Sequence, residues 1–303
     1  MVYKNRVDGK MPINSIYRTA RKLKNISLTQ LIMTCLKLPR IGPKTTLHYL
    51  QKYNNLQLIV HKMISKFGVT TWNRCFKLVT TEIEHAKASK INILNYQEAS
   101  YPQSLLTLAN FPLILYAKGN IGLLNQKKIA LIGTRKPTRI GIKQGQKVTK
   151  YLVEIGYVIV SGLAKGCDTC AHRTCLNNEG QTIAVLAAGL DQPVYPQQNR
   201  QLAADIIKNK GLLISTYPLG TKLRPQYLAA RDEWQSGIGD GVIVIETGRA
   251  GGTNITMNFC LKQHRPLARL DTKITKSVNN TVIWPLHSEN DIQKFVKLLE
   301  STK

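Results

Sequence analysis

The sequence is poor in acidic residues. It contains 17 Asp and Glu residues against 43 Lys and Arg residues, so its formal net charge is +26. Residues 1–94 hold 17 basic and 3 acidic residues, and the remainder holds 26 and 14, so both parts of the chain are basic. Charge of one sign over a whole chain favours binding to a polyanion. A requirement for solubility or a Lys-rich codon usage is the alternative explanation of this composition.

Long apolar runs are missing as well. No segment approaches the roughly 18 apolar residues of a membrane-spanning helix. The basic N-terminal residues MVYKNRVDGK lack the apolar stretch of a signal peptide. Six cysteines in a chain of 303 residues without such a signal favour reduced thiols over a disulfide framework. These absences predict a cytoplasmic protein with no membrane partner.

The common glycine motifs of nucleotide-binding proteins are absent. The chain has no GxxxxGK[ST] sequence, and its first glycine turn, Gly133-Thr134-Arg135, does not continue as GxGxxG. The second predicted strand ends in Ser161-Gly162, where a dinucleotide-binding protein would carry an acidic residue for the ribose. We therefore expect no dinucleotide and no other cofactor.

A cysteine-rich segment is the one candidate for a metal site. Cys167 and Cys170 form a CxxC pair, followed by His172 and Cys175, and these residue types can ligate zinc. All four lie at the start of one predicted helix, however, and no second ligand pair is evident. Cysteine is also a common small buried residue, and Asp168 suits the first turn of the helix. We expect structural cysteines and no bound metal.

From Lys128 onward, predicted strands and helices alternate regularly. Continuous apolar runs such as 129–132 are typical of strands buried on both faces of a parallel sheet. The predicted strands are 128–133, 157–161, 182–188, 211–216, 241–246, 266–270 and 281–284, and the predicted helices are 141–155, 168–178, 199–209, 225–237, 253–264 and 289–301. This alternation predicts an α/β fold with a doubly wound parallel sheet.

The chain divides into four predicted segments. Residues 1–26 form a basic and flexible N-terminus, 27–90 a small helical domain, 91–127 a connector with some extended structure, and 128–303 the α/β domain.

The helical domain has the outline of a helix-hairpin-helix. Ser27 is a candidate N-cap of the first helix, which stops at the segment 38–44, and a second amphipathic helix follows. In this motif a short glycine turn, here Gly42, offers backbone N–H groups to a DNA phosphate. Pro43 removes one such donor, and an ordinary pair of antiparallel helices explains the pattern equally well.

Two glycine turns are predicted to form an anion-binding site. Gly133-Thr134-Arg135 follows the first predicted strand, and Ser161-Gly162, with Lys165 close behind, follows the second. In an open α/β sheet the carboxyl ends of the strands face the ligand crevice, where backbone N–H groups and helix N-termini favour anions. We therefore expect a phosphate-binding crevice into which Arg135 and Lys165 point.

Three later segments should face the same crevice. Asn199 follows a loop and is a candidate cap of the next helix, Arg231 lies on the helix before the fifth strand, and a Gly-Gly-Thr turn opens another helix. The predicted site has no catalytic residue and comprises Gly133, Thr134, Arg135, Ser161, Gly162, Lys165, Asn199, Arg231, Gly251, Gly252 and Thr253.

Several stretches in register over residues 27–270 resemble the DNA-processing protein A (DprA/Smf) family. They are the hairpin 38–44, YPQSL, PLILYAKGN, ALIGTRKPTRIG, VIVSGLAKGCDTCAH, TIAVLAAGLDQPVYPQQN and GLLISTYPLGTKLRP. The resemblance implies a helical N-terminal domain, an extended Rossmann-like domain, and binding of single-stranded DNA without strong sequence preference. It also implies a homodimer that protects incoming single-stranded DNA and loads a RecA-type recombinase in natural transformation. The DNA-contacting positions carry over to Arg135 and Lys165.

The chain departs from the family pattern in three places: Arg231-Asp232-Glu233 replaces an RNR-like motif, Gly251-Gly252-Thr253 replaces a Ser-Gly-Ser turn, and Leu270-Asp271 replaces a Pro-Gly. These departures leave open a Rossmann-like sensor of a nucleotide signal or a LOG-type nucleotide phosphoribohydrolase. The catalytic Glu of that enzyme is absent after the Gly-Gly-Thr turn, so we expect a binding protein without enzymatic activity.

Three carboxylates lie near that turn in the predicted fold. Glu246, at the end of the fifth strand, is the best-placed acid, but it could equally brace the turn. Asp232 and Glu233 adjoin Arg231 on one helix, where only one of them can face the crevice well. We expect Arg231 to keep that carboxylate ionised.

Overall fold

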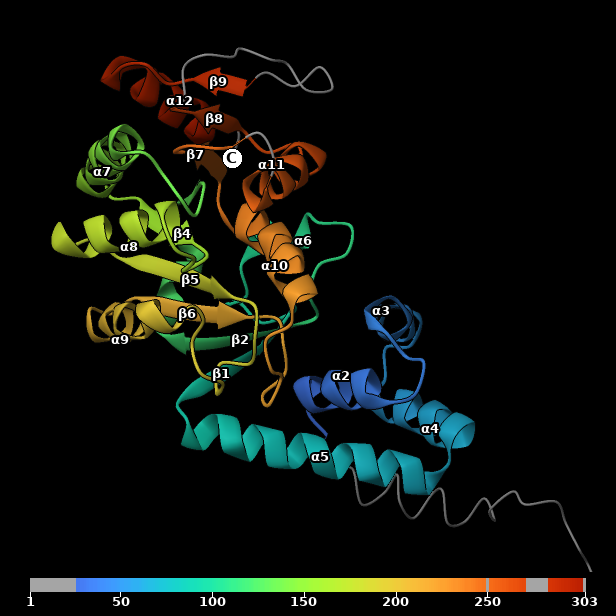
Figure 1. Cartoon of the computed structure of the whole chain (residues 1–303). Coiled ribbons are helices and arrows are strands. Elements are labelled where there is room, and N and C mark those ends of the chain that lie inside the picture. The colour runs from blue at the N-terminus through green and yellow to red at the C-terminus, as the bar shows by residue number, and fades with distance from the viewer. Residues whose placement is uncertain (1–25, 249–250, 271–282, 302–303) are drawn as a thin grey trace, which may run out of the picture. The chain divides into compact units, whose positions relative to one another are not determined.

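The computed structural model describes residues 26–248, 251–270 and 283–301 (Figure 1). The chain forms two compact units that divide between His85 and Ala86. Most of the predicted flexible N-terminus, residues 1–26, lies outside the described residues. No helix within the described ranges is both long and apolar enough to cross a membrane.

The first unit consists of helices α2 (Leu28–Lys37), α3 (Pro43–Lys52), α4 (Leu56–Phe67) and most of α5 (Val69–Ala88). The prediction that Ser27 caps the first helix is confirmed. Its Oγ accepts a hydrogen bond from the backbone of Gln30, whose side chain accepts one from the backbone of Ser27, and the two bonds form a capping box. The helices enclose an apolar core that includes Leu31, Ile59 and Trp72, each with no exposed surface.

The second unit is built on one nine-stranded sheet with the order β1-β2-β6-β5-β4-β3-β7-β8-β9. Its strands are β1 (Ile91–Asn95), β2 (Ile114–Gly119), β3 (Lys128–Ile132), β4 (Val158–Ser161), β5 (Thr182–Leu186), β6 (Leu212–Ser215), β7 (Gly241–Val244), β8 (Leu267–Arg269) and β9 (Ile283–Pro285). All pairings from β6 through β9 in this order are parallel. Every residue of β3 and β4 is buried, which confirms the prediction of strands covered on both faces.

The segment 91–127 is more than the connector that the sequence suggested. It contributes β1 and β2, a short helix α6 (Gln103–Leu106) and a 3₁₀ turn η1 (Ile121–Asn125). β2 pairs antiparallel with both β1 and β6 and thereby extends the parallel sheet at one edge. The sequence indicated some extended structure here but not its place in the main sheet, because the short apolar runs of this segment carry no strand–helix alternation.

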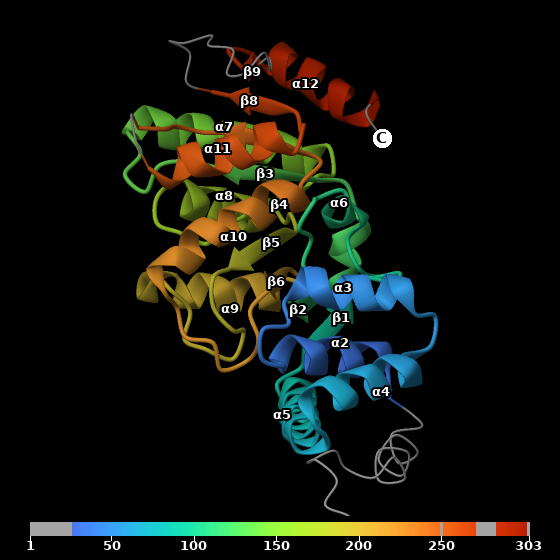
Figure 2. The ribbon, with the colours of Figure 1, turned by 90° about the vertical axis from the view of Figure 1, so that its right-hand side faces the viewer.

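Helices cover both faces of the sheet. The longer ones are α7 (Arg139–Glu154), α8 (Cys167–Asn177), α9 (Arg200–Lys208), α10 (Pro225–Ile238), α11 (Gly252–Lys262) and α12 (Glu289–Ser301), with a 3₁₀ turn η2 (Gln197–Asn199) before α9. Side chains of α7, α8 and α12 share one apolar cluster with the sheet, and α6, α10 and α11 share the other. In Figure 2, α10 and α11 cross in front of the sheet. The predicted doubly wound α/β class is therefore confirmed.

The strand order places a topological switch at β3. From β3 the chain winds through β4 and β5 to β6 on one side, then returns through α10 to β7 on the other side of β3. Ligand sites of open α/β sheets lie at the carboxyl ends of the strands beside such a switch. The segments that follow β3 and β7 are therefore where a site is expected.

Candidate functional site

The turn after β3 packs tightly against the start of α8. The backbone N–H of Cys167 donates to the carbonyl of Thr134 at 3.1 Å. A Cβ atom on Gly133 would lie 2.4 Å from Cys167 Sγ, and one on Gly166 would lie 2.4 Å from the Thr134 carbonyl oxygen. Gly166 also has a φ of +79°, which favours glycine. These glycines are therefore required for close packing of the turn against α8.

Much of the hydrogen-bonding capacity that we predicted for phosphate is used inside the protein. The carboxylate of Asp168 accepts the N–H groups of Gly162 and Ala164 at 3.1 and 3.2 Å. Ser161 is fully buried, and its hydroxyl donates to the carbonyl of Leu131. These groups of Ser161 and Gly162 are therefore already engaged, because an acidic side chain from the first turn of α8 accepts the N–H bonds there. Contact of the two residues with phosphate stays a prediction.

The backbone N–H of Thr134 is also engaged, since it donates to the carbonyl of Glu246 at 2.8 Å. Its hydroxyl accepts a bond from the backbone N–H of Lys136 at 3.2 Å. Thr134 thus shapes the turn after β3, and the exposed side chains of Arg135 and Lys136 extend from that turn.

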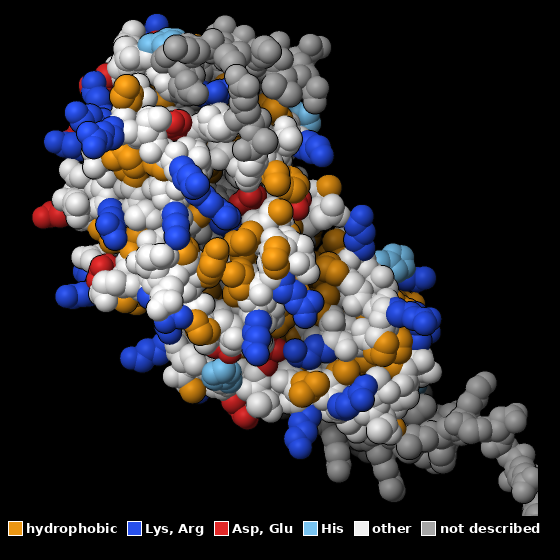
Figure 3. All heavy atoms as spheres, viewed as in Figure 1, with side chains coloured by type: hydrophobic (Ala, Val, Ile, Leu, Met, Phe, Trp, Pro, Cys, Tyr) orange, Lys and Arg blue, Asp and Glu red, His pale blue; other side chains and the backbone are white. Residues whose placement is uncertain are grey.

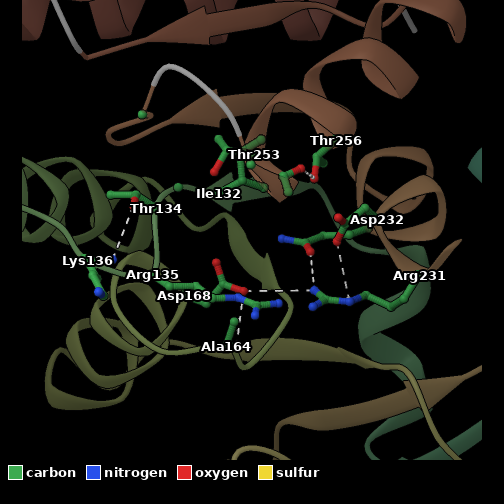
Figure 4. A pocket seen from close by; sticks show the side chains of 15 residues that line it. Ile132, Thr134, Arg135, Lys136, Ala164, Asp168, Arg231, Asp232, Thr253 and Thr256 are labelled. Atoms are coloured by element: carbon green, nitrogen blue, oxygen red, sulfur yellow. Dashed lines mark hydrogen bonds and ion pairs between the residues drawn. The ribbon is translucent and has the colours of Figure 1, made fainter. Parts of the chain in front are cut away.

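A cavity of about 420 Å³ lies at the carboxyl ends of β3 and β7, at the topological switch (Figure 4). It brings together seven of the predicted site residues, namely Gly133, Thr134, Arg135, Arg231, Gly251, Gly252 and Thr253. The N-terminus of α11 lines one wall, where the positive end of the helix dipole favours an anion. Gly251 has a φ of +144°, a conformation that other residues rarely adopt.

Lys165 lies beyond the cavity lining. It is exposed on the turn after β4, next to Ala164, which does line the cavity. Because β3 and β4 are paired neighbours, Arg135 and Lys165 follow adjacent strands, as the sequence predicted. Neither cation forms an ion pair within the described ranges.

Arg231 is not the free cation that we expected. Only 4 % of its surface is exposed, and its Nη1 lies 3.9 Å from Asp168 Oδ2 while its Nε lies 3.6 Å from Asp232 Oδ1. Its guanidinium also donates to the side chain of Gln235. Arg231 is therefore a buried part of the cavity wall that neutralises two carboxylates, which would otherwise lack a counter-ion.

The pKa of Asp232 is unusually high for a carboxyl group beside an arginine. Burial raises its pKa to about 6, against the opposing effect of Arg231. Arg231 lowers the pKa of Asp232, in the predicted direction, but the loss of hydration outweighs this attraction. The carboxylate is therefore ionised at neutral pH but is protonated more easily than a free one. Asp232 lines the cavity, so it loses its negative charge there as the pH falls through about 6.

Asn199 does not bind at the crevice through a free side chain, nor does that side chain cap α9. The residue is buried, and its Nδ2 donates to the carbonyls of Leu163 and Ala164 at 2.8 and 3.2 Å and to the hydroxyl of Thr169 at 2.8 Å. It therefore supports the turn on which Lys165 lies. Only the tertiary structure brings that turn to a residue more than thirty positions away.

Glu246 braces the start of α7 and not the Gly-Gly-Thr turn that the sequence suggested. Its Oε2 accepts hydrogen bonds from the backbone N–H and the hydroxyl of Thr138 at 2.9 and 3.1 Å. Thr138 in turn caps α7 by accepting the N–H of Gly141. A Cβ on Gly141 would lie 1.8 Å from Glu246 Oε2, so close approach of α7 requires glycine here.

The cysteines of α8 lie in the interface between this helix and the rest of the unit. Cys167, Cys170 and Cys175 are buried and free, and burial raises the pKa of the Cys167 and Cys175 thiols to about 12. His172 contacts the hydroxyl of Thr182 at 2.7 Å, and burial lowers its pKa to about 3. Across the part of the chain that the structure describes, no three such side chains are grouped to hold a metal ion. The absence of zinc stays a prediction.

Sequence reasoning missed several residues of the cavity lining: Lys136, Gln235, Gly248 and Thr256. Lys136 could have been found, because it adjoins Arg135 in the same turn. The others lie on α10, after β7 and on α11. No motif marks these residues. Gln235 and Thr256 reach the cavity through the packing of α10 and α11.

Comparison with known proteins places this geometry in a family. The family model for DNA recombination-mediator protein A matches residues 92–289, more than half of the chain. The chain is 37 % identical over 176 residues to DNA processing protein DprA of Bacillus subtilis, a match that covers 58 % of this chain and 59 % of the relative. A DprA of Streptococcus pneumoniae is 37 % identical over 180 residues, which cover 59 % and 63 %. The chain thus spans about three fifths of the length of these curated relatives.

Two solved structures are similar over more of their length. DprA from Streptococcus pneumoniae matches with a TM-score of 0.63 and 27 % identity, covering 95 % of this chain and 94 % of that one. A structure that describes the single-stranded DNA binding mode of DNA processing protein A from Helicobacter pylori matches with a TM-score of 0.60 and 25 % identity, covering 70 % and 97 %. By its sequence, its sheet topology and the match over residues 92–289, the chain belongs to the DNA recombination-mediator protein A family.

Proposed function

We propose that this protein binds single-stranded DNA at the carboxyl edge of its sheet, with Arg135 and Lys165 on the phosphate backbone. The observation that carries the proposal is the pair of exposed, unpaired cations beside the cavity of about 420 Å³ at the switch point. Family membership and the single-stranded DNA binding of the Helicobacter pylori relative support it. Gly251, Gly252 and Thr253, at the start of α11, would receive a further phosphate.

An exposed tyrosine at the same edge supports an unpaired strand as the ligand. Tyr195, which is 51 % exposed, lines a hollow with apolar residues such as Leu223 and Leu228. Gly162 and Arg231 line this hollow too, and Arg231 also lines the cavity, so the two depressions adjoin. Aromatic surfaces beside cations favour bases that are free to stack.

The test is a binding titration with fluorescent single-stranded DNA, with duplex DNA and mononucleotides as competitors, across a salt series. We expect affinity for single strands to rise with their length and to fall linearly with the logarithm of the salt concentration. Saturable one-to-one binding of a mononucleotide, with no preference for longer strands, would favour the nucleotide-sensor alternative, which the cavity volume also suits.

The proposal includes the setting implied by the family. We infer a cytoplasmic homodimer that protects incoming single-stranded DNA and transfers it to a RecA-type recombinase. Light scattering of the purified chain tests the dimer. Assembly of recombinase filaments on DNA coated with single-strand binding protein, with and without this protein, tests the transfer.

Binding at this edge should depend on the charge of Asp232. Because its pKa is about 6, acidification from about pH 7.5 to about pH 5 neutralises a carboxylate that repels phosphate. We expect single-stranded DNA to bind roughly fivefold more tightly at the lower pH, which corresponds to about 1 kcal/mol of removed repulsion. Asp232→Asn should bind tightly over the whole range. Equal pH dependence in the variant and the natural protein would assign the effect to another group.

We also propose that the site binds without chemical turnover. The most suitable acid, Glu246, is engaged by Thr138 in bracing α7. Incubation with nucleoside monophosphates is therefore expected to release no free base and no ribose phosphate in a chromatographic assay. Release that disappears in Glu246→Gln would establish a hydrolase instead.

A further inference from the structure

A second basic surface lies on the helical unit, outside residues 92–289 that the family model matches. Arg40, Lys44, His48 and Lys52 are spaced four residues apart, and all are exposed. Arg40 lies in the turn before α3, and the other three lie on α3 itself. Residues four apart share one face of a helix and advance about 6 Å per step. We call these four residues the α3 basic stripe.

The other face of α3 packs against the core of the helical unit. Thr46 is buried, and Tyr49, Leu50 and Tyr53 pack against the core of the helical unit. The rings of Tyr49 and Tyr53 stack with their centroids 6.1 Å apart, and Lys52 Nζ lies 5.7 Å from the centre of the Tyr53 ring. Because these contacts hold the apolar face inward, the stripe faces away from the core.

No acidic residue neutralises the stripe from within its own helices. The sequence contains no Asp or Glu from residue 9 to residue 81. Glu82, the first acidic residue after that interval, is buried and pairs with Lys37 at 2.7 Å. Among the described residues, the cations of the stripe form no ion pair. Figure 3 shows Lys and Arg side chains distributed over the surface of this unit.

The turn before α3 is open and ordered. Gly42 caps the helix, and a Cβ atom there would meet no heavy atom within 4 Å. The N–H of Ile41 donates to the carbonyl of Leu38, and Arg40 has a φ of +58°. The positive end of the helix dipole therefore lies beside Arg40 and Lys44, where it reinforces their attraction for an anion.

We infer that the α3 basic stripe is a second DNA-binding surface, which holds the phosphate backbone of duplex DNA by charge. A duplex carries one negative charge per roughly 1.7 Å of its axis, so cations placed along one face of α3 and in the turn before it can contact several phosphates. Tyr49 of α3 and Tyr53, its C-cap, are half-buried by the core, so neither tyrosine offers a fully open ring for unpaired bases. The exposed ring of the stripe is the small imidazole of His48. This surface shares no residue with the proposed single-stranded site.

The test compares variants of the full chain in a fluorescence titration with a short blunt-ended duplex. In Arg40→Gln/Lys44→Gln/Lys52→Gln, we expect duplex binding at low salt to weaken at least tenfold. The slope of log affinity against log salt should decrease by about 2.7, which is about 0.9 for each lost contact. Failure of the natural protein to bind duplex, or unchanged binding in the folded triple variant, would overturn the inference.

A matched control separates a local site from total charge. Lys62→Gln/Arg74→Gln/Lys77→Gln removes three exposed charges from α4 and α5 in the same unit. We expect this control to retain most of the duplex affinity, and an equal loss would refute the assignment to α3. Circular dichroism checks the fold, and Lys44→Gln alone should give a smaller loss in the same direction. Titration of the same variants with single-stranded DNA reports separately on the proposed function.

Discussion

Replacement of Arg135 and Lys165 together by alanine is expected to weaken single-stranded DNA binding about 100-fold at moderate salt. Each contact between a charged donor and a phosphate contributes about 1.5 kcal/mol, which is about tenfold in Kd. Each single variant should show about one tenth of the natural affinity. Both side chains are exposed and form no ion pair within the described residues, and Arg135 also attracts the buried carboxylate of Asp232 from a distance.

The salt dependence tests whether the lost contacts are with phosphate. The slope of log affinity against log salt should fall by about 0.7 for each lost contact, hence by about 1.4 in the double variant. The loss should be similar for oligonucleotides of different sequence, because phosphate contacts carry no sequence information.

A matched control is Arg173→Ala/Lys208→Ala, which removes one exposed Arg and one exposed Lys from α8 and α9. This control should bind nearly as the natural protein does. Unchanged affinity in Arg135→Ala/Lys165→Ala, with the fold intact, would remove the cavity edge from consideration as the binding site.

Gly162→Ala is expected to produce the largest loss of stability. A Cβ atom at this position would lie 1.2 Å from Nη1 of Arg231, whose guanidinium is buried between Asp168 and Asp232. Either the turn or Arg231 must move, and a displaced Arg231 leaves two buried carboxylates without their counter-ion. We expect the free energy of unfolding to fall by at least about 3 kcal/mol.

Urea unfolding followed by circular dichroism measures this effect. Gly252→Ala is the control, because it adds the same methyl group in the cavity lining but meets only Asp232 Oδ2, at 3.6 Å. Its stability should stay within about 0.5 kcal/mol of the natural value. A Gly162→Ala protein as stable as this control would show that Arg231 can leave its site at little cost.

The sequence by itself determined the class of fold and the edge of the sheet at which a site forms. Continuous apolar runs such as 129–132 require strands covered on both faces, and their alternation with amphipathic helices requires a parallel sheet. Glycine turns after the strands then mark the carboxyl edge. These features depend on local periodicity, which a sequence displays directly.

Only the tertiary structure decided which polar groups at that edge are free. Asp168, Arg231 and Asn199 are all polar residues near the predicted crevice, yet each is buried and engaged with partners distant in the sequence. A motif shows which groups can donate or accept hydrogen bonds but not which ones already do. The exposure of Arg135 and Lys165, and the pKa of about 6 at Asp232, follow from how α8 and α10 pack against the sheet, because burial and pairing depend on three-dimensional neighbours.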